Sequence, residues 1–192
     1  MLDRLIGNWV YGGFLAGVLL LVLGPVLTGG WPASLASAYL LLPVYMLHQY
    51  EEHDGDRFRR FANETVGHGV EVLSRGFVFL VNIPGVWGTI AVSLILAYAV
   101  HPGFTLIAVY LVLVNALAHI AQAVKMRRYN PGLATGVVLF LPAGVFALVE
   151  TQRGGGGTLA MHIVGLVVAI GIHAGIVAHV RRRLHAHGHA HA

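Results

Sequence analysis

Long apolar runs alternate with short polar breaks along this chain of 192 residues. A helix that crosses a bilayer needs about 20 mostly apolar residues, and six runs approach or reach that length. Breaks rich in Gly and Pro separate most of these runs, as is typical where one helix ends and the next begins. The pattern predicts six transmembrane helices, at residues 9–27, 33–48, 76–100, 104–124, 133–149 and 159–180.

The composition supports a membrane protein. Hydrophobic residues make up 57% of the chain and charged residues only 10%, with a mean hydropathy of +0.75. A soluble domain has about 25% charged residues. The chain has no Cys, which excludes disulfides and thiolate metal sites. We therefore predict an all-α, polytopic membrane helix bundle in one domain at 1–184, followed by a His-rich tail at 185–192 that we expect to be disordered.

The basic residues predict the orientation of the bundle. If the N-terminus lies in the cytoplasm, every Lys and Arg except Arg153 falls in a cytoplasmic segment. Cytoplasmic loops of membrane proteins carry an excess of Lys and Arg. We expect a multi-pass protein of the inner membrane with both termini in the cytoplasm.

Two departures from simple spans are also predicted. Residues 51–75 are rich in charge, but Phe58 and Phe61 recur among the charges. This pattern indicates a short amphipathic helix at the cytoplasmic interface after the second span. The third span, at 76–100, contains Pro84, which removes a backbone donor and predicts a kink or a break there.

The most informative polar cluster lies at the end of the second span. Residues three and four apart share a helix face, so His48 lies beside both Glu51 and Glu52. Imidazole beside carboxylates is typical of metal sites in helix bundles, and ionisable residues at membrane depth are usually functional. All three are candidate metal ligands. A carboxylate not used as a ligand would act as a general base, and His53 or His119 would relay protons. Glu51, Glu52 and His53 are the catalytic candidates. A helix end with solvated charges is the alternative.

Three further histidines are candidate ligands. His68 has Glu64 and Glu71 on the same predicted helix face, although an exposed polar face explains the spacing as well. His119 and His173 lie at similar predicted depths in the fourth and sixth spans. Interhelical hydrogen bonding is the alternative for His119, and the small residues around His173 indicate close helix packing.

Ligands with nitrogen and oxygen but no sulfur suit a divalent metal, zinc or iron, as one or two ions. A site at the membrane edge suits a lipid or another apolar substrate, with Arg57, Arg60 and Arg128 as candidates for holding an anionic headgroup. Setting the topology is the alternative role for these arginines. We predict a metal-dependent membrane hydrolase or oxidoreductase with membrane lipids as its partners.

Other functions stay open. A metal or proton-coupled transporter and a non-catalytic accessory subunit of a membrane complex are the alternatives to an enzyme. A transporter should show a polar path through the bundle, and the outer half of the chain has few polar residues. Nucleic-acid binding is not expected, because the basic residues flank the spans and form no separate face.

The run His-Gln-Tyr-Glu-Glu at 48–52 resembles the defining motif of the HXXEE family of bacterial integral membrane proteins. Shorter segments extend the resemblance over about 47–135, namely 55–61, 82–88, Asn115 with His119, and 129–133. The family is named for its motif, so the resemblance implies a membrane protein but no reaction. Many relatives follow the motif with an aromatic residue and a Pro-Gly-rich stretch. This chain has His-Asp-Gly-Asp at 53–56 instead, so it resembles a divergent branch of the family.

Overall fold

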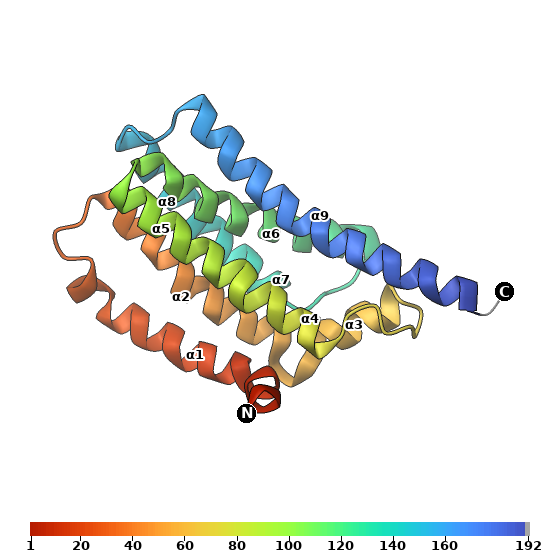
Figure 1. The fold of residues 1–192 in the computed structure, drawn as a ribbon. Coiled ribbons are helices and arrows are strands. Elements are labelled where there is room, and N and C mark those ends of the chain that lie inside the picture. The colour runs from red at the N-terminus through yellow and green to blue at the C-terminus, as the bar shows by residue number, and fades with distance from the viewer. Residues whose placement is uncertain (191–192) are drawn as a thin grey trace.

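The computed structural model describes residues 1–190, and the regular secondary structure in that part of the chain is all helical (Figure 1). The long helices are α1 (Leu2–Leu27), α2 (Ala33–His53), α6 (Thr105–Met126), α8 (Leu141–Arg153) and α9 (Leu159–Ala190). Shorter elements extend or connect them: η1 (Asp54–Asp56), α3 (Arg57–Thr65), α4 (Arg75–Leu80), η2 (Val81–Trp87), α5 (Gly88–Ala99), η3 (Pro102–Phe104), α7 (Leu133–Thr135) and η4 (Gly136–Phe140). The predicted helix bundle is confirmed.

Five helical segments are long and apolar enough to cross a membrane: Leu2–Leu27, Arg75–Ala99, Pro102–Met126, Leu133–Arg153 and Leu159–His187. The outward-facing sides of these helices carry exposed apolar side chains. Leu15, Val22 and Val167, for example, are 67%, 71% and 63% exposed. So much bare apolar surface is unfavourable in water but suits contact with lipid tails. The chain is a multi-pass membrane protein.

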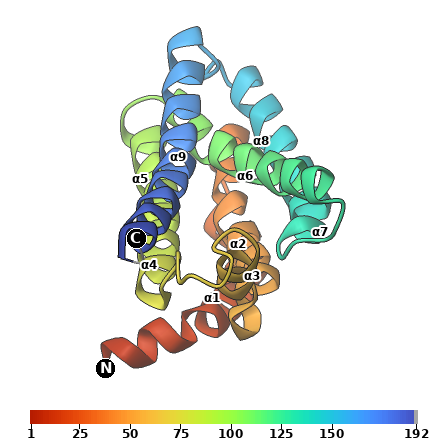
Figure 2. The same ribbon diagram turned by 90° about the vertical axis from the view of Figure 1, so that its right-hand side faces the viewer.

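The helix α2 accounts for the remaining predicted span, and it is less apolar than the others because it lies inside the bundle. It packs against α1, α5, α6 and α8 (Figure 2). Even its polar side chains are buried, including Ser34, Ser37 and Gln49. A helix that touches protein on most sides needs no apolar surface for lipid. Because α2 is central, the motif at 48–52 on this helix lies in the interior of the bundle.

The predicted break in the third span is a π-helical segment rather than a sharp kink. The helices α4 and α5 are joined without interruption by η2, which contains Pro84. The side chain of Asn82 donates to the Val78 carbonyl (2.8 Å), and Thr89 donates to the Gly85 carbonyl. Pro84 has no N–H to donate, and these two side chains add hydrogen bonds to carbonyls on either side of it.

The amphipathic helix predicted after the second span is α3, and it is shorter than the charged stretch. The chain leaves the helix after Thr65, and His68 and Gly69 take left-handed backbone conformations (φ 51° and 92°). The Asn63 side chain then accepts from the backbone N–H groups of Val72 and Leu73 (3.0 and 2.9 Å), which folds the loop back over α3. We call the end of the bundle that carries this helix the α3 end.

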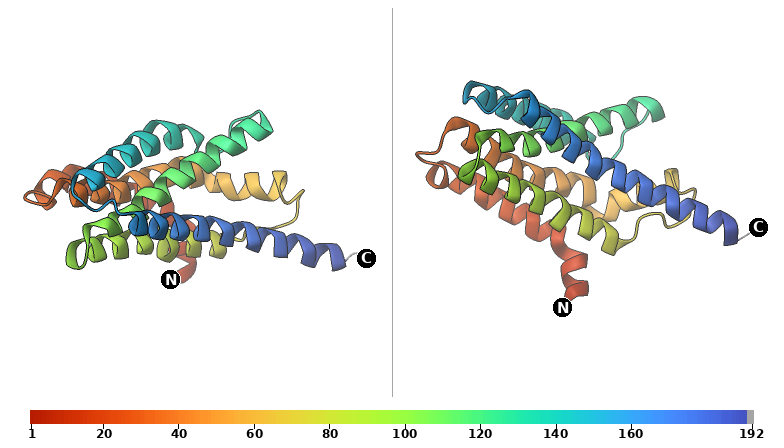
Figure 3. Two further views of the ribbon diagram at one scale, coloured as in Figure 1. Left: turned by 90° about the horizontal axis from the view of Figure 1, so that it is seen from above. Right: turned by 45° about the horizontal axis from the view of Figure 1, so that its top comes forward.

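The helices α6 and α9 run in the same direction and separate toward their carboxyl ends (Figure 3). They are closest near their starts, where a Cβ atom on Gly165 would lie 2.6 Å from the Leu106 carbonyl oxygen. The helix α9 continues past the bundle through 185–190, where the sequence predicts a disordered tail. Residues 191–192 of that predicted tail lie outside the described residues. The division into one domain and a tail stays a prediction.

Candidate metal centre

The carboxyl-terminal turn of α2 points two ionisable side chains into the bundle. His48 and Glu52 are four residues apart and share the buried face of the helix, with 0% and 6% of their surface exposed. The rings of Tyr45 and Phe140 pack against His48, with centroids 5.7 and 4.1 Å away. Glu52 is largely removed from water, so its charge must be balanced by nearby groups.

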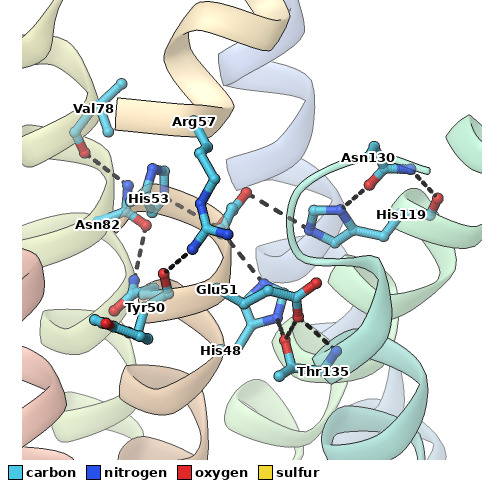
Figure 4. Close-up of polar contacts among 12 residues, drawn as sticks. His48, Tyr50, Glu51, His53, Arg57, Val78, Asn82, His119, Asn130 and Thr135 are labelled. Carbon is cyan, nitrogen blue, oxygen red and sulfur yellow. Dashed lines mark hydrogen bonds and ion pairs between the residues drawn. The ribbon is translucent and has the colours of Figure 1, made fainter. Parts of the chain in front are cut away.

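A third side chain reaches this pair from α6. His119 is 5% exposed, and its Nε2 lies 3.6 Å from Oε1 of Glu52 (Figure 4). Nε2 of His48 lies 3.5 Å from Oε2 of the same carboxylate. One nitrogen or oxygen atom from each of these three residues lies within 4.8 Å of the others. His48, Glu52 and His119 therefore form one buried cluster of potential metal ligands.

Hydrogen bonds on the other ring nitrogens orient both imidazoles. Nδ1 of His48 lies 2.8 Å from Oγ1 of Thr135, whose hydroxyl already donates to Glu51. The Thr135 oxygen must therefore accept from His48 Nδ1–H. Nδ1 of His119 lies 2.7 Å from Oδ1 of Asn130, and the Asn130 amide nitrogen donates to the His119 carbonyl (2.9 Å). We assign the ring proton to Nδ1 in both histidines on these partners.

This assignment turns the Nε2 lone pairs of both histidines toward the Glu52 carboxylate. Nε2 of His48 is buried and has no hydrogen-bond partner among the described residues. A lone pair that faces a carboxylate is repelled by its negative charge unless a cation lies between the two groups. Distances of 3.5 and 3.6 Å exceed those of ordinary hydrogen bonds. Ligand atoms around a tetrahedral metal, with bonds of about 2.0–2.1 Å, lie about 3.3 Å apart. The donor set and its spacing fit a metal ion.

The loop between α6 and α7 closes over the two imidazoles. Gly132 has φ 98°, a conformation that favours glycine. A Cβ atom at this position would lie 2.6 Å from Cε1 of His119 and 2.9 Å from Cε1 of His48. No side chain fits in that space. The loop backbone can cover the cluster only because residue 132 is a glycine.

Glu51, which the sequence predicts as a ligand and a catalytic residue, points away from the cluster. Its carboxylate accepts from the backbone N–H groups of Ala134 (3.1 Å) and Thr135 (2.7 Å), and from the hydroxyls of Thr135 and Tyr129. Burial and the hydrogen bond to Glu51 raise the pKa of Tyr129 to about 12, so this phenol remains a donor at neutral pH. Glu51 thus caps α7 and orients His48 through Thr135. Glu51 is not one of the three clustered residues, and its predicted roles as a metal ligand and a catalytic residue stay predictions.

His53 approaches the Glu52 carboxylate from the side opposite the cluster. Its Nε2 lies 3.1 Å from Oε2 of Glu52, and its ring packs between Trp9 and Phe58, with centroids 5.1 and 5.6 Å away. His53 is buried but is not one of the three clustered ligands. Its predicted catalytic role stays a prediction.

The two remaining predicted ligands lie elsewhere. His68 is exposed in the loop after α3, because the helix ends before it and the predicted stripe with Glu64 and Glu71 does not form. It is not one of the clustered residues, and its role as a ligand stays a prediction. His173 is half-buried on α9, and its Nδ1 lies 2.8 Å from the Ala169 carbonyl. It is outside the cluster but lines the cavity described below.

The arginines predicted to hold a headgroup have protein partners. Arg57 donates to the Tyr50 carbonyl (3.2 Å) and pairs with Asp54, and Arg60 donates to the Gly55 carbonyl (2.8 Å). Arg128 donates to the Thr65 hydroxyl and lies over the ring of Phe61. These contacts stabilise the loops around α3. A role in lipid binding stays a prediction.

A neighbouring arginine, Arg59, organises the start of α3. It pairs with Asp56 (2.6 Å) and with Glu71 (3.0 Å). Burial alone would raise the pKa of Asp56, but its hydrogen bond and charge interaction with Arg59, helped by Arg75, hold that pKa below its usual value. The same carboxylate raises the pKa of Arg59. This network ties α3 to the loop that returns to α4.

Three residues of the centre were missed by sequence reasoning: Asn130, Gly132 and Thr135. The sequence identifies 129–132 as a break between helices and 129–133 as part of the family resemblance, but it gives these three residues no role. One feature of the sequence indicates that this loop belongs to the site. The break follows the helix that carries His119, and an Asn and a Gly there supply an amide partner and room for close backbone approach.

A cavity of about 270 Å³ lies directly beside the cluster, between α2, α3, η2, α6 and α9. Glu52, His53 and His119 line it, together with Asn115 and His173. The rest of its wall is mostly apolar, with side chains from 73–86 and 172–177. The cluster is therefore placed where a bound molecule could reach it.

Comparison with known proteins gives one match. A family model described as "Protein of unknown function with HXXEE motif" matches residues 39–147, which include all three clustered ligands and the residues that orient them. No curated protein and no solved structure shows a significant match to the chain.

Proposed function

The chain belongs to the family of proteins with an HXXEE motif, and we propose that it is a metalloenzyme embedded in the membrane. One observation carries the proposal. Two buried imidazoles, each with its proton assigned to Nδ1, turn their Nε2 lone pairs onto the Glu52 carboxylate. In the motif, His48 and the second Glu are ligands, and the first Glu orients His48 through Thr135.

The ligand set favours zinc or iron, because imidazole and carboxylate without thiolate suit both. The cluster supplies three ligands for one ion. His53, on the other side of the Glu52 carboxylate, is the nearest candidate ligand for a second ion. A bound metal with an open position would supply a Lewis acid and an activated water or dioxygen. Three protein ligands in a catalytic zinc site leave such a position.

The substrate we propose is a lipid or another apolar molecule. The cavity beside Glu52 and His119 is mostly apolar and has a few polar side chains in its wall. Such cavities bind molecules through their apolar surface and orient them with a few polar contacts. Hydrolysis and dioxygen chemistry both remain compatible with this arrangement, as a metal-dependent hydrolase or oxidoreductase.

The membrane we propose is the cytoplasmic (inner) membrane, with both termini in the cytoplasm. Every Lys and Arg except Arg153 then lies on the cytoplasmic side, in agreement with the positive-inside rule. The α3 end, and with it the metal centre, faces the cytoplasm in this orientation.

A transporter or an accessory subunit is less well supported. Beyond the cluster, the interior is filled by Leu41, Ile90, Leu106 and Val112, each with 0% exposure. A transported ion would need polar groups through this region. An accessory subunit gives no reason for burying Glu52 among three imidazoles.

The test measures bound metal in the full chain, with the tail histidines changed to glutamine so that they cannot bind it. Elemental analysis of this protein should find zinc or iron at about one equivalent per cluster. His48→Ala and Glu52→Ala should lose the metal. His162→Ala is the matched control, because His162 lies on α9 at the opposite end, beside Tyr110.

Two results would contradict the metal centre: no bound metal in the parent protein, or metal that persists in His48→Ala and Glu52→Ala. Catalysis is tested separately, by mass spectrometry of membrane lipids incubated with metal-loaded protein. Product should form with the parent protein and not with Glu52→Gln. Equal product from both proteins would exclude an enzyme that uses this centre.

A further inference from the structure

The cavity beside the metal centre lies where α6 and α9 have separated. The two helices touch near Leu106 and Gly165 and diverge toward the α3 end (Figure 3). The space between them is floored by α2 and η2, which contribute Tyr45 and Val86.

A few polar side chains interrupt its mostly apolar wall. Glu52 and His119 of the metal centre line the cavity, Asn115 and Gln122 lie on α6 with His119, and Asn82 and His173 come from η2 and α9. Oδ1 of Asn115 is buried and has no hydrogen-bond partner among the described residues. A buried acceptor without a donor is unfavourable, so a ligand with an N–H or O–H group would be stabilised here. No Lys or Arg is among the described residues that line the cavity.

At the α3 end of the cavity, rings and apolar side chains of α4 and α9 pack against one another. Phe77 stacks on His179, with centroids 3.6 Å apart and an interplanar angle of 10°. Behind this stack, Val72 and Leu73 pack with Leu184 of α9 in a buried apolar cluster. A water-soluble molecule would have to separate α4 from α9 to enter from this side.

The lateral side of the cavity is open. Among the described residues that line it, Ala118 of α6 and Val177 of α9 are the exposed ones. Their neighbours Leu117 and Val124 are also exposed, by 58% and 72%. Ala118 lies about 10 Å along the helix axis from Lys125, so this mouth opens at the depth of the lipid tails.

We propose that the cavity binds a neutral, single-chain amphiphile that enters from the membrane between α6 and α9. This inference rests on the proposed metal centre. The polar head lies at Glu52 and His119, with a donor directed to Asn115, and the chain leaves past Ala118 and Val177. A neutral head follows from the lack of cationic side chains in the wall. A single chain follows from the volume of about 270 Å³, just below the usual range for ligand pockets.

The experiment compares two hydroxamic acids that are uncharged in solution near neutral pH, bind metal through the same head after losing a proton and differ in chain length, acetohydroxamate and octanohydroxamate. Each is titrated into Co²⁺-loaded full-length protein in lipid nanodiscs, and binding is followed by the visible absorption of the metal. Ala118→Phe fills the mouth. Ala121→Phe is the matched control, because Ala121 is also exposed on α6 but does not line the cavity.

We expect Ala118→Phe to bind octanohydroxamate about tenfold more weakly, because displacing two methylenes from the mouth has about that effect. Its affinity for acetohydroxamate should be unchanged, and Ala121→Phe should match the parent protein with both probes. A second pair tests the other side of the mouth. Val177→Trp should behave like Ala118→Phe, and Ile170→Trp like the parent, although Val177 and Ile170 are both 51% exposed.

Octanohydroxamate binding that is unchanged in Ala118→Phe and Val177→Trp would overturn the lateral mouth and leave the metal centre intact. Equal weakening by the mouth and control variants would overturn it too, since the effect would then come from the lipid-facing surface. A parent protein that binds neither Co²⁺ nor acetohydroxamate would instead overturn the metal centre, and this inference with it.

Discussion

Glu51 and Thr135 lie 84 residues apart in the sequence and are joined by two hydrogen bonds, one to the backbone N–H of Thr135 (2.7 Å) and one to its hydroxyl. The same hydroxyl oxygen accepts from Nδ1 of His48. The first Glu of the motif, Glu51, therefore orients the His of the motif, His48, through a residue on another helix. This chain of contacts explains why a motif on α2 needs a partner just after the loop at 129–132.

Removing the Thr135 hydroxyl should weaken metal binding without removing a ligand. Thr135→Val keeps the shape of the side chain, but it leaves Nδ1 of His48 without an acceptor. We expect metal affinity, measured by chelator competition, to fall about 10–100-fold, as is typical for groups that orient a ligating histidine. Thr135→Ser should restore most of it. Unchanged affinity in Thr135→Val would show that Thr135 does not orient His48.

Gly132→Ala should disturb the metal centre as well as strain the backbone at a residue with positive φ. The new methyl group would lie 2.6 Å from the His119 ring, so the loop or the imidazoles must move. Gly30→Ala is the control, because Gly30 has a similar φ (87°) and open space around its Cα. Both variants should lose about 1 kcal/mol of stability to backbone strain. Only Gly132→Ala should lose metal in elemental analysis, and equal metal content in the two variants would contradict the close approach of this loop.

The Asp56–Arg59 pair should make stability depend on pH. The folded state holds the pKa of Asp56 below its usual value, so the carboxylate stabilises the protein above the unfolded pKa. That contribution is lost as the pH falls through the lower, folded pKa. Asp56→Asn should cost about 1 kcal/mol at pH 7 and progressively less below pH 4, in thermal unfolding in detergent. Asp3→Asn, at the exposed start of α1, should not show this trend. A cost that is constant with pH would contradict an ionised pair.

The sequence predicts the fold well because a helix in contact with lipid must have a long apolar run, which is easy to recognise. Apolar runs of bilayer length and one-sided basic residues are sufficient to place the spans. The central helix α2 follows this pattern least, since its surroundings are protein. The spacing of His48 and Glu52 predicts a shared face, and His119 is predicted from its depth.

The sequence does not predict which neighbour of His48 turns inward. Glu51 and Glu52 are three and four residues from His48, and helical spacing alone allows both. The choice depends on α7, whose backbone N–H groups attract Glu51 from 84 residues away. His68 does not share a helix face with Glu64 for a local reason, because α3 ends at Thr65, before Gly67 and Gly69. Long-range capping and helix ends of this kind are not encoded in periodicity.

Asn115 and Asn82 give the sharpest contrast between a polar group that awaits a ligand and one that stabilises the fold. Both line the cavity. Asn82 accepts from Gln49 (2.8 Å) and donates to Val78, whereas Oδ1 of Asn115 has no partner among the described residues. Asn82→Leu should therefore lower the thermal stability, because it leaves buried partners unsatisfied. Asn115→Leu should leave stability unchanged or raise it, because it removes an unpaired acceptor. In metal-loaded protein, Asn115→Leu should weaken octanohydroxamate binding about tenfold, the effect of one hydrogen bond of about 1.4 kcal/mol. If Asn115→Leu instead destabilises the protein as much as Asn82→Leu and binds the hydroxamate normally, Asn115 belongs to the packing of the bundle and not to the binding of a ligand.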